Sequence, residues 1–362
     1  MKVAILADQI DSGVRQGQTS YAFNLIAGFK KTGIDVTLLY ADIPVATNYP
    51  FIRKRSYRVY NLPFISEKIR DVIINIFASK YDILHVLTNS GMPAGRSKAK
   101  KIITLHDVII FKHPEFYTKY TLSYLIRDIK RDLQRVDAII TGSEHSKKDI
   151  CEVFDYNEDK VYVIYHGIDK EIFYKQDKPR LISEDYILYV GGPHRRKGLP
   201  YLLAAFSRLK EYVPHKLLLV DNIGSRYEEF TEEFIRQALM DRIIIKTRAT
   251  VDELGNYYSF AEMLVYPSLY EGFGLPPLEA MACGCPVITS NNSALKEVYD
   301  GFGLLVDPKD VENFANTMLK VISDNTLKNI LKEKGLDLSI RLSHERMAQT
   351  TLESYEKILC QS

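Results

Sequence analysis

The feature that most constrains the fold is a repeated alternation between short runs of β-branched residues and longer amphipathic stretches. Near the start, KVAIL is followed by a polar loop, an apolar-periodic stretch over 21–29 and the run DVTLLY, which predicts strand, loop, helix and strand. A helix is expected over 120–133, and further strands are expected at 83–86, 102–105, 138–141 and 161–164. Strands that alternate with helices predict a parallel sheet covered on both faces.

The alternation stops at a polar stretch between Asp169 and Asp185 and then starts again. The strands expected beyond it are YILYV, KLLLV, RIIIK, MLVYP, PVITS and GLLVDP. The helices expected between them cover 199–210, 228–239, 251–260 and 277–283. The sequence therefore predicts an α/β protein with two doubly wound domains, 1–168 and 169–342, a linker at 169–185 and a terminal helical segment, 343–362.

Composition excludes several classes of protein. Lys and Arg number 48 and Asp and Glu number 46 among 362 residues, a net charge of +2. Nucleic-acid-binding proteins carry a one-sided basic excess, so no nucleic-acid partner is expected. No run approaches the ~18 apolar residues that span a bilayer, and Asp8 interrupts the first apolar run, so we expect a cytoplasmic chain. The 4 cysteines are too few to crosslink it, in agreement with a reducing compartment.

The most informative motif is SLYEGFGLPPLEAMACGCPVITS, over 268–290, which follows the strand MLVYP. Gly272 and Gly274 allow close backbone approach to a ligand, and two prolines pre-set a helix start that attracts anions by ~0.3–1 kcal/mol. We expect Glu271 before this helix and Glu279 in its first turn, both facing a ligand with vicinal hydroxyls. In the alternative interpretation, Glu279 only favours the helix dipole and Glu271 is a solvated loop residue.

A second motif, YVGGPHRRKG, follows the first strand of the second domain. Gly191 and Gly192 supply a flexible turn, and Arg195, Arg196 and Lys197 supply three cations at the carboxyl end of a strand. This arrangement fits a diphosphate. The alternative is a solvated basic turn.

Two weaker candidates lie in the first domain. Gly17 opens the helix after the first strand, and His106 ends the strand IITL. Because ligands bind beyond the carboxyl ends of parallel strands, His106 could offer a hydrogen bond to a sugar or an acceptor. A histidine after a strand is more often structural, and that alternative stays open.

Several motifs are absent from the sequence. Neither G-x-x-x-x-G-K-[ST] nor a complete G-x-G-x-x-G occurs, so kinase and dehydrogenase functions are not expected. No two aspartates are separated by one residue, so the Asp-x-Asp pair that chelates a divalent cation for a nucleotide diphosphate is missing. We expect cations and a helix end to replace a metal ion.

The segment EGFGLPPLEAMACGCPVITS resembles the E-x7-E motif of the retaining glycosyltransferases of family 4, with Glu271 and Glu279 at its two ends. Further matches, in the family's usual order, are ITLHDVIIFKHPEFY, VDAIITGSEHSKKDI, VYVIYHGIDKEIF and YVGGPHRRKG. The resemblance implies the GT-B fold, in which two Rossmann-like domains face each other across a cleft. The first domain would hold the acceptor, the second a nucleotide-diphosphate-sugar donor, and segment 343–362 would cross back to the first domain.

The resemblance also implies roles for residues of the second domain. Glu279 would hold the ribose hydroxyls, Arg196 with Lys197 would neutralise the diphosphate, and Glu271 would contact the donor sugar. Backbone N–H groups expected near the sugar and the phosphates are those of Phe273, Gly274 and Leu275. Because charge develops on both the departing diphosphate and the sugar, we expect the cations and the carboxylate on opposite sides of the breaking bond.

In the first domain, the resemblance implies that His106 touches the donor sugar near the reacting carbon and that Gly17 lets its helix approach the phosphates. The sequence departs from the family's pattern at three places, and one is the first glycine loop, which keeps only Gly17 of a frequent Gly-Gly pair. Many relatives carry Arg where Gly192 stands, so donor binding there leans harder on the Arg196 and Lys197 pair. The usual turn near the nucleobase is replaced by Lys246–Arg248, which leaves the base undetermined.

The activity implied is transfer of a hexose, mannose or glucose, with retention, to a glycan, lipid-linked or small-molecule acceptor in cell-surface glycan biosynthesis. No metal or other cofactor is expected. Two alternatives stay open: a sugar-nucleotide epimerase of GT-B type, against which the E-x7-E motif argues, and a non-catalytic sugar-nucleotide-binding protein. Peripheral membrane contact is a further hypothesis, because FIRKRSYRVY, over 51–60, interleaves cations with aromatics. A solvated loop and strand is the alternative for that segment.

Overall fold

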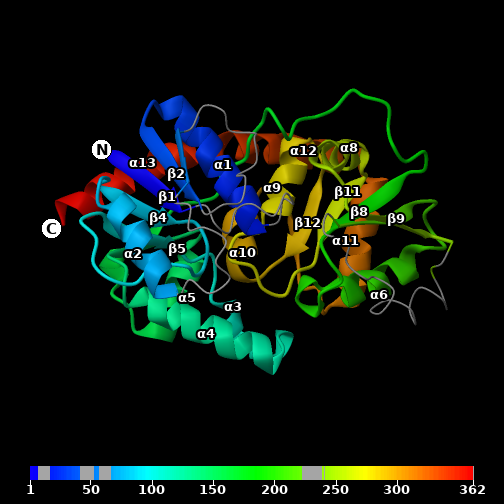
Figure 1. Ribbon diagram of the computed structural model, residues 1–362. Helices are drawn as coiled ribbons and strands as arrows, with labels where there is room; N and C mark the ends of the chain where they lie inside the picture. The colour runs from blue at the N-terminus through cyan, green and yellow to red at the C-terminus, as the bar shows by residue number, and fades with distance from the viewer. Residues whose placement is uncertain (7–16, 41–52, 57–66, 222–238, 240, 362) are drawn as a thin grey trace. The chain divides into compact units, whose positions relative to one another are not determined.

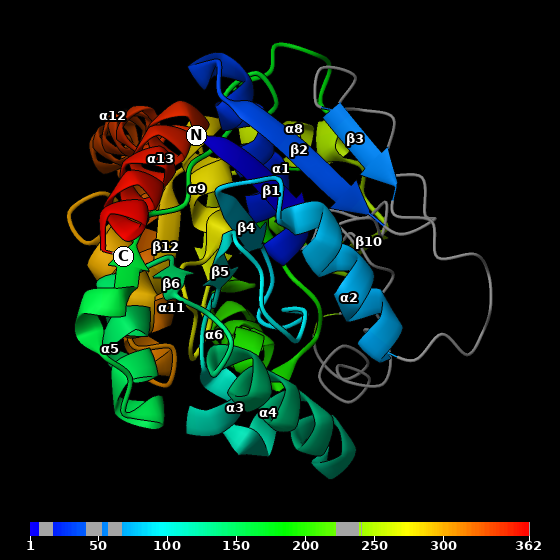
Figure 2. The same cartoon turned by 60° about the vertical axis from the view of Figure 1, so that its left-hand side comes forward.

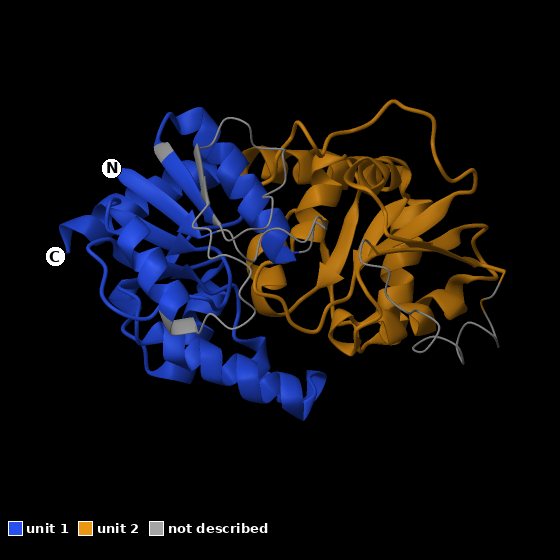
Figure 3. Ribbon diagram, in the orientation of Figure 1, with its two compact units in different colours: residues 1–167, 344–362 blue, residues 168–343 orange. Residues whose placement is uncertain are grey.

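The computed structural model describes residues 1–6, 17–40, 53–56, 67–221, 239 and 241–361 (Figure 1). The chain forms two compact units, which Figure 3 colours separately. Unit 1 contains Met1–Gly167 and His344–Ser362, and unit 2 contains Ile168–Ser343.

Within the described ranges, unit 1 holds a parallel sheet of seven strands in the order β3-β2-β1-β4-β5-β6-β7. The strands are β1 (Lys2–Leu6), β2 (Asp35–Tyr40), β3 (Arg53–Ser56), β4 (Ile83–Val86), β5 (Lys100–Thr104), β6 (Ala138–Thr141) and β7 (Val161–Val163). The helices are α1 (Gly17–Thr32), α2 (Glu67–Ala78), α3 (Ile109–Lys112), α4 (Lys119–Leu133), α5 (Glu144–Phe154) and α13 (His344–Cys360), with 3-10 turns at Pro114–Phe116 and Glu158–Lys160. Figures 1 and 2 show α4 at the lower edge of this unit.

Unit 2 repeats this architecture with a parallel sheet of six strands, among the residues described, in the order β10-β9-β8-β11-β12-β13. The strands are β8 (Tyr186–Val190), β9 (Lys216–Asp221), β10 (Ile243–Thr247), β11 (Met263–Tyr266), β12 (Val287–Ser290) and β13 (Leu304–Val306). The helices are α6 (Leu199–Leu209), α8 (Val251–Phe260), α9 (Leu275–Ala282), α10 (Ser293–Tyr299), α11 (Val311–Ser323) and α12 (Asn325–Arg341), with a 3-10 turn at Arg195–Lys197.

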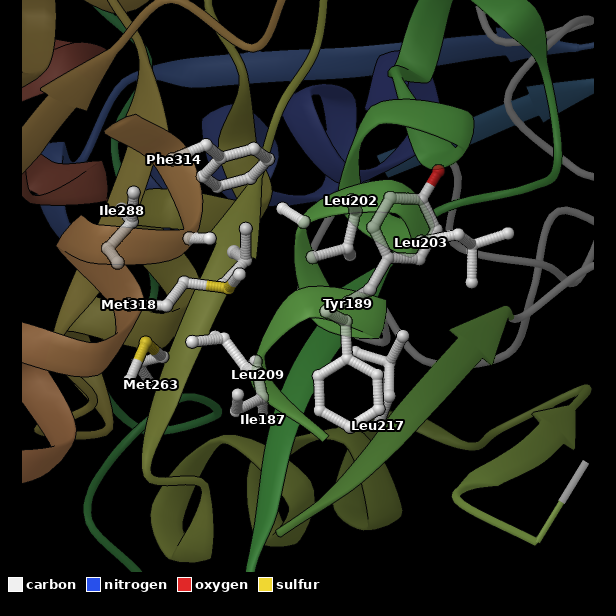
Figure 4. Packing of buried hydrophobic residues seen from close by; sticks show 14 of the residues in the cluster. Ile187, Tyr189, Leu202, Leu203, Leu209, Leu217, Met263, Ile288, Phe314 and Met318 are labelled. Carbon is white, nitrogen blue, oxygen red and sulfur yellow. The ribbon is translucent and has the colours of Figure 1, made fainter. Parts of the chain in front are cut away.

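The central strands β1, β4, β8 and β11 are buried along nearly their whole length, as expected where helices cover both faces of a sheet. One core of unit 2 lies between the sheet and helices α6 and α11 (Figure 4). Tyr189 from β8, Leu202 from α6 and Phe314 from α11 are all buried there. Burial of each such side chain stabilises the fold by about 1.5–3 kcal/mol relative to exposure.

Helix α13 packs against α1 inside unit 1, although the two helices lie at opposite ends of the sequence. A Cβ atom at Gly28 would lie 2.2 Å from the carbonyl oxygen of His344 and 2.7 Å from Cβ of Ala348. Lys31 and Glu345 form an ion pair of 2.7 Å at the edge of this contact. Glycine is therefore required at position 28 for the helices to approach this closely.

The predicted α/β class and the expected strands are confirmed by the two sheets. The expected helix over 228–239 and the basic aromatic segment 51–60 lie outside the described residues, apart from the position of Leu239 and the backbone of strand β3.

The stretch 169–185, which we expected to be a linker, is folded as part of unit 2. Phe173 and Gln176 are buried, and the backbone N–H of Gln176 donates to Ser259 Oγ at 2.9 Å. The polar residues of this stretch thus make hydrogen bonds within a folded unit, and the prediction of a linker there is wrong.

Candidate active site

The loop after strand β11 places Glu271 among four donors. The side chain is buried, and the residue keeps only 7% of its surface exposed. Its Oε1 accepts hydrogen bonds from Lys197 Nζ at 2.7 Å, Tyr266 Oη at 2.9 Å and Ser268 Oγ at 2.6 Å. Its Oε2 lies 3.0 Å from Nη1 of Arg196. The alternative of a solvated loop carboxylate is therefore wrong.

These neighbours decide the ionisation of Glu271. Burial raises the pKa of this carboxyl group, but the charges of Lys197 and Arg196 and the hydrogen bonds from Lys197 and Ser268 outweigh it and hold the pKa at about 2. Glu271 is thus a carboxylate throughout the physiological pH range. Burial, and then the negative charge of Glu271, raise the pKa of Tyr266 well above its ordinary value.

The structure brings Glu271 into direct contact with Arg196 and Lys197. Their expected positions on opposite sides of the breaking bond stay a prediction. Strands β8 and β11 are neighbours in the sheet and run parallel, so the turn after one and the loop after the other meet at the same edge. Sequence reasoning missed this because it did not establish the strand order.

The cationic turn interlocks with the loop that carries Glu271. Gly198, which ends the turn, has a φ of 69°, and a Cβ atom there would lie 1.9 Å from the carbonyl oxygen of Pro267. The backbone N–H of Leu269 donates to the carbonyl oxygen of Arg196 at 2.8 Å, and Arg196 Nη1 donates to that of Tyr270 at 3.2 Å. The alternative of a solvated basic turn is wrong for Arg196 and Lys197, whose side chains are largely covered.

Helix α10 supports the same loop from its other side. Ser293 adopts a φ of 46°, a backbone conformation that costs a non-glycine residue about 1–3 kcal/mol, and its Oγ accepts the backbone N–H of Glu271 at 3.1 Å. Tyr299 Oη donates to the carbonyl oxygen of Gly274 at 2.5 Å. Gly274 has a φ of 85°, and a Cβ atom there would lie 2.6 Å from Leu295 Cδ2. The loop is thus held in one conformation.

Helix α9 follows this loop, with Gly274 as its N-cap and Leu275 as its first residue. Pro276 and Pro277 carry no backbone N–H, so Leu275 is the one residue in the first three positions of the helix that does. The backbone groups expected near the donor, those of Phe273, Gly274 and Leu275, follow one another at this helix start. Their contact with a donor stays a prediction.

Glu279 lies in the second turn of α9, not in the first, because the helix begins two residues before the expected Pro277. Its carboxylate is buried, and its Oε2 accepts a hydrogen bond from Tyr258 Oη of helix α8 at 2.9 Å. This position argues against the alternative in which Glu279 only stabilises the helix dipole, because the interaction of a charge with the dipole falls off within the first turn. Binding of ribose hydroxyls by Glu279 stays a prediction.

In the turn after β8, the carbonyl oxygen of Gly192 accepts two hydrogen bonds. One comes from Tyr189 Oη at 3.0 Å and the other from the backbone N–H of His194 at 2.8 Å.

The segment Lys246–Arg248 was expected to be a loop, but strand β10 continues through Thr247. Arg248 follows the strand in the left-handed conformation, with a φ of 58°. The pairing of β10 with β9 extends the strand to that point.

In unit 1, His106 is buried just beyond the carboxyl end of β5. Its backbone N–H donates to Asn89 Oδ1 at 2.8 Å, and its Nε2 lies 3.0 Å from the carbonyl oxygen of Leu87. That contact requires a proton on Nε2, so Nδ1 carries the lone pair of the neutral ring. Burial lowers the pKa of His106 to about 4, in spite of the opposing hydrogen bond to Leu87.

The ring of His106 belongs to a cluster of buried aromatic and imidazole rings. Tyr21 from α1 lies edge-on to it, with ring centroids 4.9 Å apart, and the centroid of His166 lies 5.6 Å away. A Cβ atom at Gly142 would lie 2.7 Å from Nε2 of His166. Gly17, the first residue of α1, is exposed, and a Cβ atom there would meet nothing within 4 Å.

A chain of hydrogen bonds joins this cluster to helix α13. Tyr21 Oη lies 3.2 Å from Thr104 Oγ1, which lies 2.8 Å from Nε2 of His85. Nδ1 of His85 lies 2.6 Å from Tyr355 Oη on α13. Sequence reasoning missed these residues, and it missed Tyr266 and Ser268 in unit 2. For Thr104, Tyr266 and Ser268 the available signal was a polar side chain at, or just beyond, the carboxyl end of a strand.

In the part of the chain that the structure describes, no group of three or more His, Cys, Asp and Glu side chains is arranged to hold a metal ion. No helix there combines the length and apolar character needed to cross a membrane.

Comparison with known proteins accounts for both units. The family model "Glycosyl transferases group 1" matches residues 171–337, and the model "Glycosyltransferase Family 4" matches residues 15–172. The chain is a glycosyltransferase of family 4. The interlocked loops of unit 2 and the imidazole cluster of unit 1 are therefore features of a glycosyltransferase.

This glycosyltransferase is similar in sequence to enzymes named for mannose transfer. It is 28% identical to the O-antigen chain mannosyltransferase B of Escherichia coli over 71% of this chain and 70% of that protein. It is 26% identical to the serotype-specific mannosyltransferase WbdA of Escherichia coli over 81% of this chain but only 39% of that longer protein.

Solved structures share the fold of this glycosyltransferase. Sucrose-phosphate synthase from Thermosynechococcus elongatus superposes with a TM-score of 0.77 and 22% identity, covering 100% of both chains. Anabaena HepE, solved in complex with UDP-glucose, superposes with a TM-score of 0.75 and 18% identity over 99% of this chain and 100% of that chain. The predicted GT-B fold is confirmed.

Proposed function

We propose that this glycosyltransferase transfers a hexose, with retention at the anomeric carbon, from a nucleotide-diphosphate-sugar to a hydroxyl group of a glycan acceptor. The observation that carries the proposal is the buried contact of Glu271 with Arg196 and Lys197, at 3.0 Å and 2.7 Å, next to the start of α9. The mannosyltransferase relatives favour mannose as the sugar and cell-surface glycans as the product.

In the proposed reaction, the bond between the anomeric carbon and the diphosphate oxygen breaks, and the electron pair leaves with the diphosphate. The acceptor hydroxyl oxygen bonds to the same face of that carbon, and its proton passes to the departing diphosphate. Arg196 and Lys197 stabilise the negative charge that develops there, and Glu279 holds the ribose hydroxyls. For His106 and Gly17 we propose the contacts with donor sugar and phosphates that the family resemblance implies.

We assign Glu271 the task of holding the two cations. Three donors within 2.9 Å occupy its Oε1, and Arg196 occupies its Oε2. A carboxylate in this environment is a weak nucleophile, which favours front-face attack by the acceptor over a covalent intermediate on Glu271. Its negative charge still lies close enough to Lys197 to orient that ammonium group toward a diphosphate.

We further propose that the reaction needs no metal ion, because Arg196 and Lys197 supply the charge that a divalent cation would otherwise supply. The test is transfer activity after treatment with EDTA and gel filtration. Full activity is expected, and a loss that added Mg²⁺ or Mn²⁺ restores would contradict the proposal.

The donor is tested by a thermal-shift panel of nucleotide diphosphates and their sugars. A ligand at ~100 times its dissociation constant stabilises the folded state by ~2.7 kcal/mol, so the cognate donor should raise the melting temperature by several degrees. Glu279→Gln should weaken this shift, whereas Lys334→Met, on the exposed face of α12, should leave it unchanged. No shift with any compound, or equal shifts in all three proteins, would contradict donor binding at this site.

Incubation of the donor without acceptor separates the remaining alternatives. An epimerase converts the sugar of the donor itself, whereas a transferase gives at most slow hydrolysis. A non-catalytic binding protein gives neither product, with or without an acceptor. We expect transfer only when a glycan acceptor is added, detected as a mass increase of one hexose.

A lipid-linked acceptor, a cytoplasmic location and peripheral membrane contact stay predictions. Sedimentation with neutral and anionic liposomes at low salt tests the contact. Cosedimentation with anionic liposomes alone is expected, and equal behaviour with both would contradict it.

A further inference from the structure

Helix α4 has an outward face that the unit 1 core does not use. Its inward residues, Ile129 and Leu133, are buried in that core. Tyr120, Tyr124 and Arg127 follow one another at helical spacing on the opposite side. We call Tyr120, Tyr124, Arg127, Asp128 and Arg131 the α4 ridge.

The first part of the α4 ridge is aromatic. Tyr120 is 80% exposed and Tyr124 is 38% exposed, and their ring centroids lie 5.7 Å apart at an interplanar angle of 58°. A scattered exposed aromatic residue needs no explanation, but two adjacent rings on one outward helix face form a platform with a ring face available to a partner.

The second part of the α4 ridge is a charge network in which one carboxylate pairs with two guanidinium groups. Asp128 Oδ1 lies 3.1 Å from Nη2 of Arg127 and 3.4 Å from Nη1 of Arg131. Arg127, which is 71% exposed, still offers donors beside a carboxylate acceptor. Vicinal hydroxyls need both donors and acceptors, and the paired guanidinium and carboxylate groups supply both. This combination fits the hydroxyl groups of a sugar.

The α4 ridge begins near the edge of the unit 1 sheet at which His106 lies. Strands β5 and β6 are parallel neighbours, so the connection between them, which contains α4, must return from the carboxyl end of β5 to the amino end of β6. The first turn of α4, with Tyr120, therefore lies toward the edge at which His106 follows β5. Figures 1 and 2 show α4 at the border of the unit.

We propose that the α4 ridge binds the glycan acceptor, with Tyr120 and Tyr124 stacking on the apolar C–H faces of hexose rings and the Arg127–Asp128 pair binding ring hydroxyls. This inference rests on the proposed function, because a transferase that extends a glycan must hold several sugars of its acceptor. The ridge supplies a subsite for sugars at a distance from the reacting hydroxyl.

The absence of tryptophan from the sequence allows a direct test. Tyr120→Trp keeps an aromatic face on the ridge and makes it the sole fluorescent indole. Tyr212→Trp, at a tyrosine of unit 2 that is 77% exposed, is the matched control. Both proteins are titrated with linear mannohexaose, and separately with vesicles of mixed phosphatidylcholine and phosphatidylglycerol, without any nucleotide sugar.

We expect a saturable change in the emission of the Tyr120→Trp protein with mannohexaose and no change in the Tyr212→Trp protein. Adding Tyr124→Ala to Tyr120→Trp should raise the dissociation constant by about two- to tenfold, the range expected for loss of one ring contact. Both rings are outside the core, so circular dichroism should show that the variants fold.

No response to mannohexaose, an equal response in both indole proteins, or a response to vesicles alone would overturn the proposal. Because no donor is present, these outcomes are independent of the thermal-shift panel. Failure of the ridge can thus be distinguished from failure of the proposed donor site.

Discussion

Lys197 Nζ lies 2.7 Å from Glu271 Oε1, although 74 positions separate the two residues in the sequence. Tyr266 joins the pair, since its Oη accepts from Lys197 Nζ at 2.7 Å and donates to Glu271 Oε1 at 2.9 Å. The contact neutralises a buried carboxylate and ties the turn after β8 to the loop after β11. It therefore combines a structural task with the positioning of a cation.

Replacing Lys197 by Met should affect both tasks. The variant keeps the length of the side chain but removes the charge and two hydrogen bonds, leaving Glu271 with Arg196 as its remaining cation. We expect the unfolding free energy to fall by about 1–3 kcal/mol and the proposed transfer rate to fall by about a hundredfold. Urea denaturation and a transfer assay measure these quantities, with Lys334→Met as the control. An unchanged stability would show that the contact contributes nothing.

The low pKa of Glu271 predicts how stability depends on pH. The pKa is lowered in the folded state from an ordinary 4.5 to about 2, so the stabilising contribution is present above about 4.5 and is lost as the pH falls toward 2. We expect the unfolding free energy of the wild type, relative to Glu271→Gln, to decrease by up to ~1.4 kcal/mol per pH unit in that window. Urea denaturation from about pH 6 to about pH 3 measures it, and a constant difference would contradict the assignment.

The buried histidines should make the unfolding free energy depend on pH in a higher pH range than Glu271 does. Burial lowers the pKa of His85 to about 3 and that of His106 to about 4, and it lowers the pKa of His166 well below the ordinary 6.5. Below about 6.5 the unfolded chain binds protons that the folded chain does not, so the unfolding free energy should fall as the pH falls from 6.5 toward 4, by up to ~1.4 kcal/mol per unit for each ring. His106→Gln should reduce the slope of the unfolding free energy against pH by the contribution of about one proton. An unchanged slope would contradict this prediction.

Gly28 should be essential for the docking of α13. In Gly28→Ala the new methyl group would overlap the carbonyl oxygen of His344, so we expect a loss of about 1–3 kcal/mol or more in unfolding free energy. Urea denaturation measures the loss, and limited proteolysis should cut the segment before α13 faster.

Gly17→Ala is the matched control, because a Cβ atom at Gly17 meets nothing within 4 Å. That change should be neutral or should stabilise α1 by up to ~1 kcal/mol. Equal effects of the two substitutions would contradict the close approach at Gly28.

Sequence reasoning predicted strands and helices well where burial is local. The runs YILYV and MLVYP became β8 and β11, because apolar residues on both faces of a strand require cover on both sides. It predicted that Glu271, Arg196 and Lys197 follow strands. It did not predict that they meet, because that depends on β8 and β11 being neighbours in a sheet.

For the stretch 169–185, sequence reasoning made a different error, because it predicted a linker where the chain is folded. Its polar composition is typical of a linker, yet Gln176 is buried against α8 and donates its backbone N–H to Ser259 Oγ. Composition reports how polar a segment is, and it does not report whether its hydrogen bonds are made to water or to another part of the chain.

By itself, the sequence determined the alternation of strands and helices, the two-unit α/β class and the placement of the E-x7-E residues after a strand, since periodicity and turn residues act over a few positions. Only the tertiary structure decided that Lys197 contacts Glu271 and that α13 packs on Gly28. These contacts join distant segments, and they depend on strand order and on how closely two backbones approach.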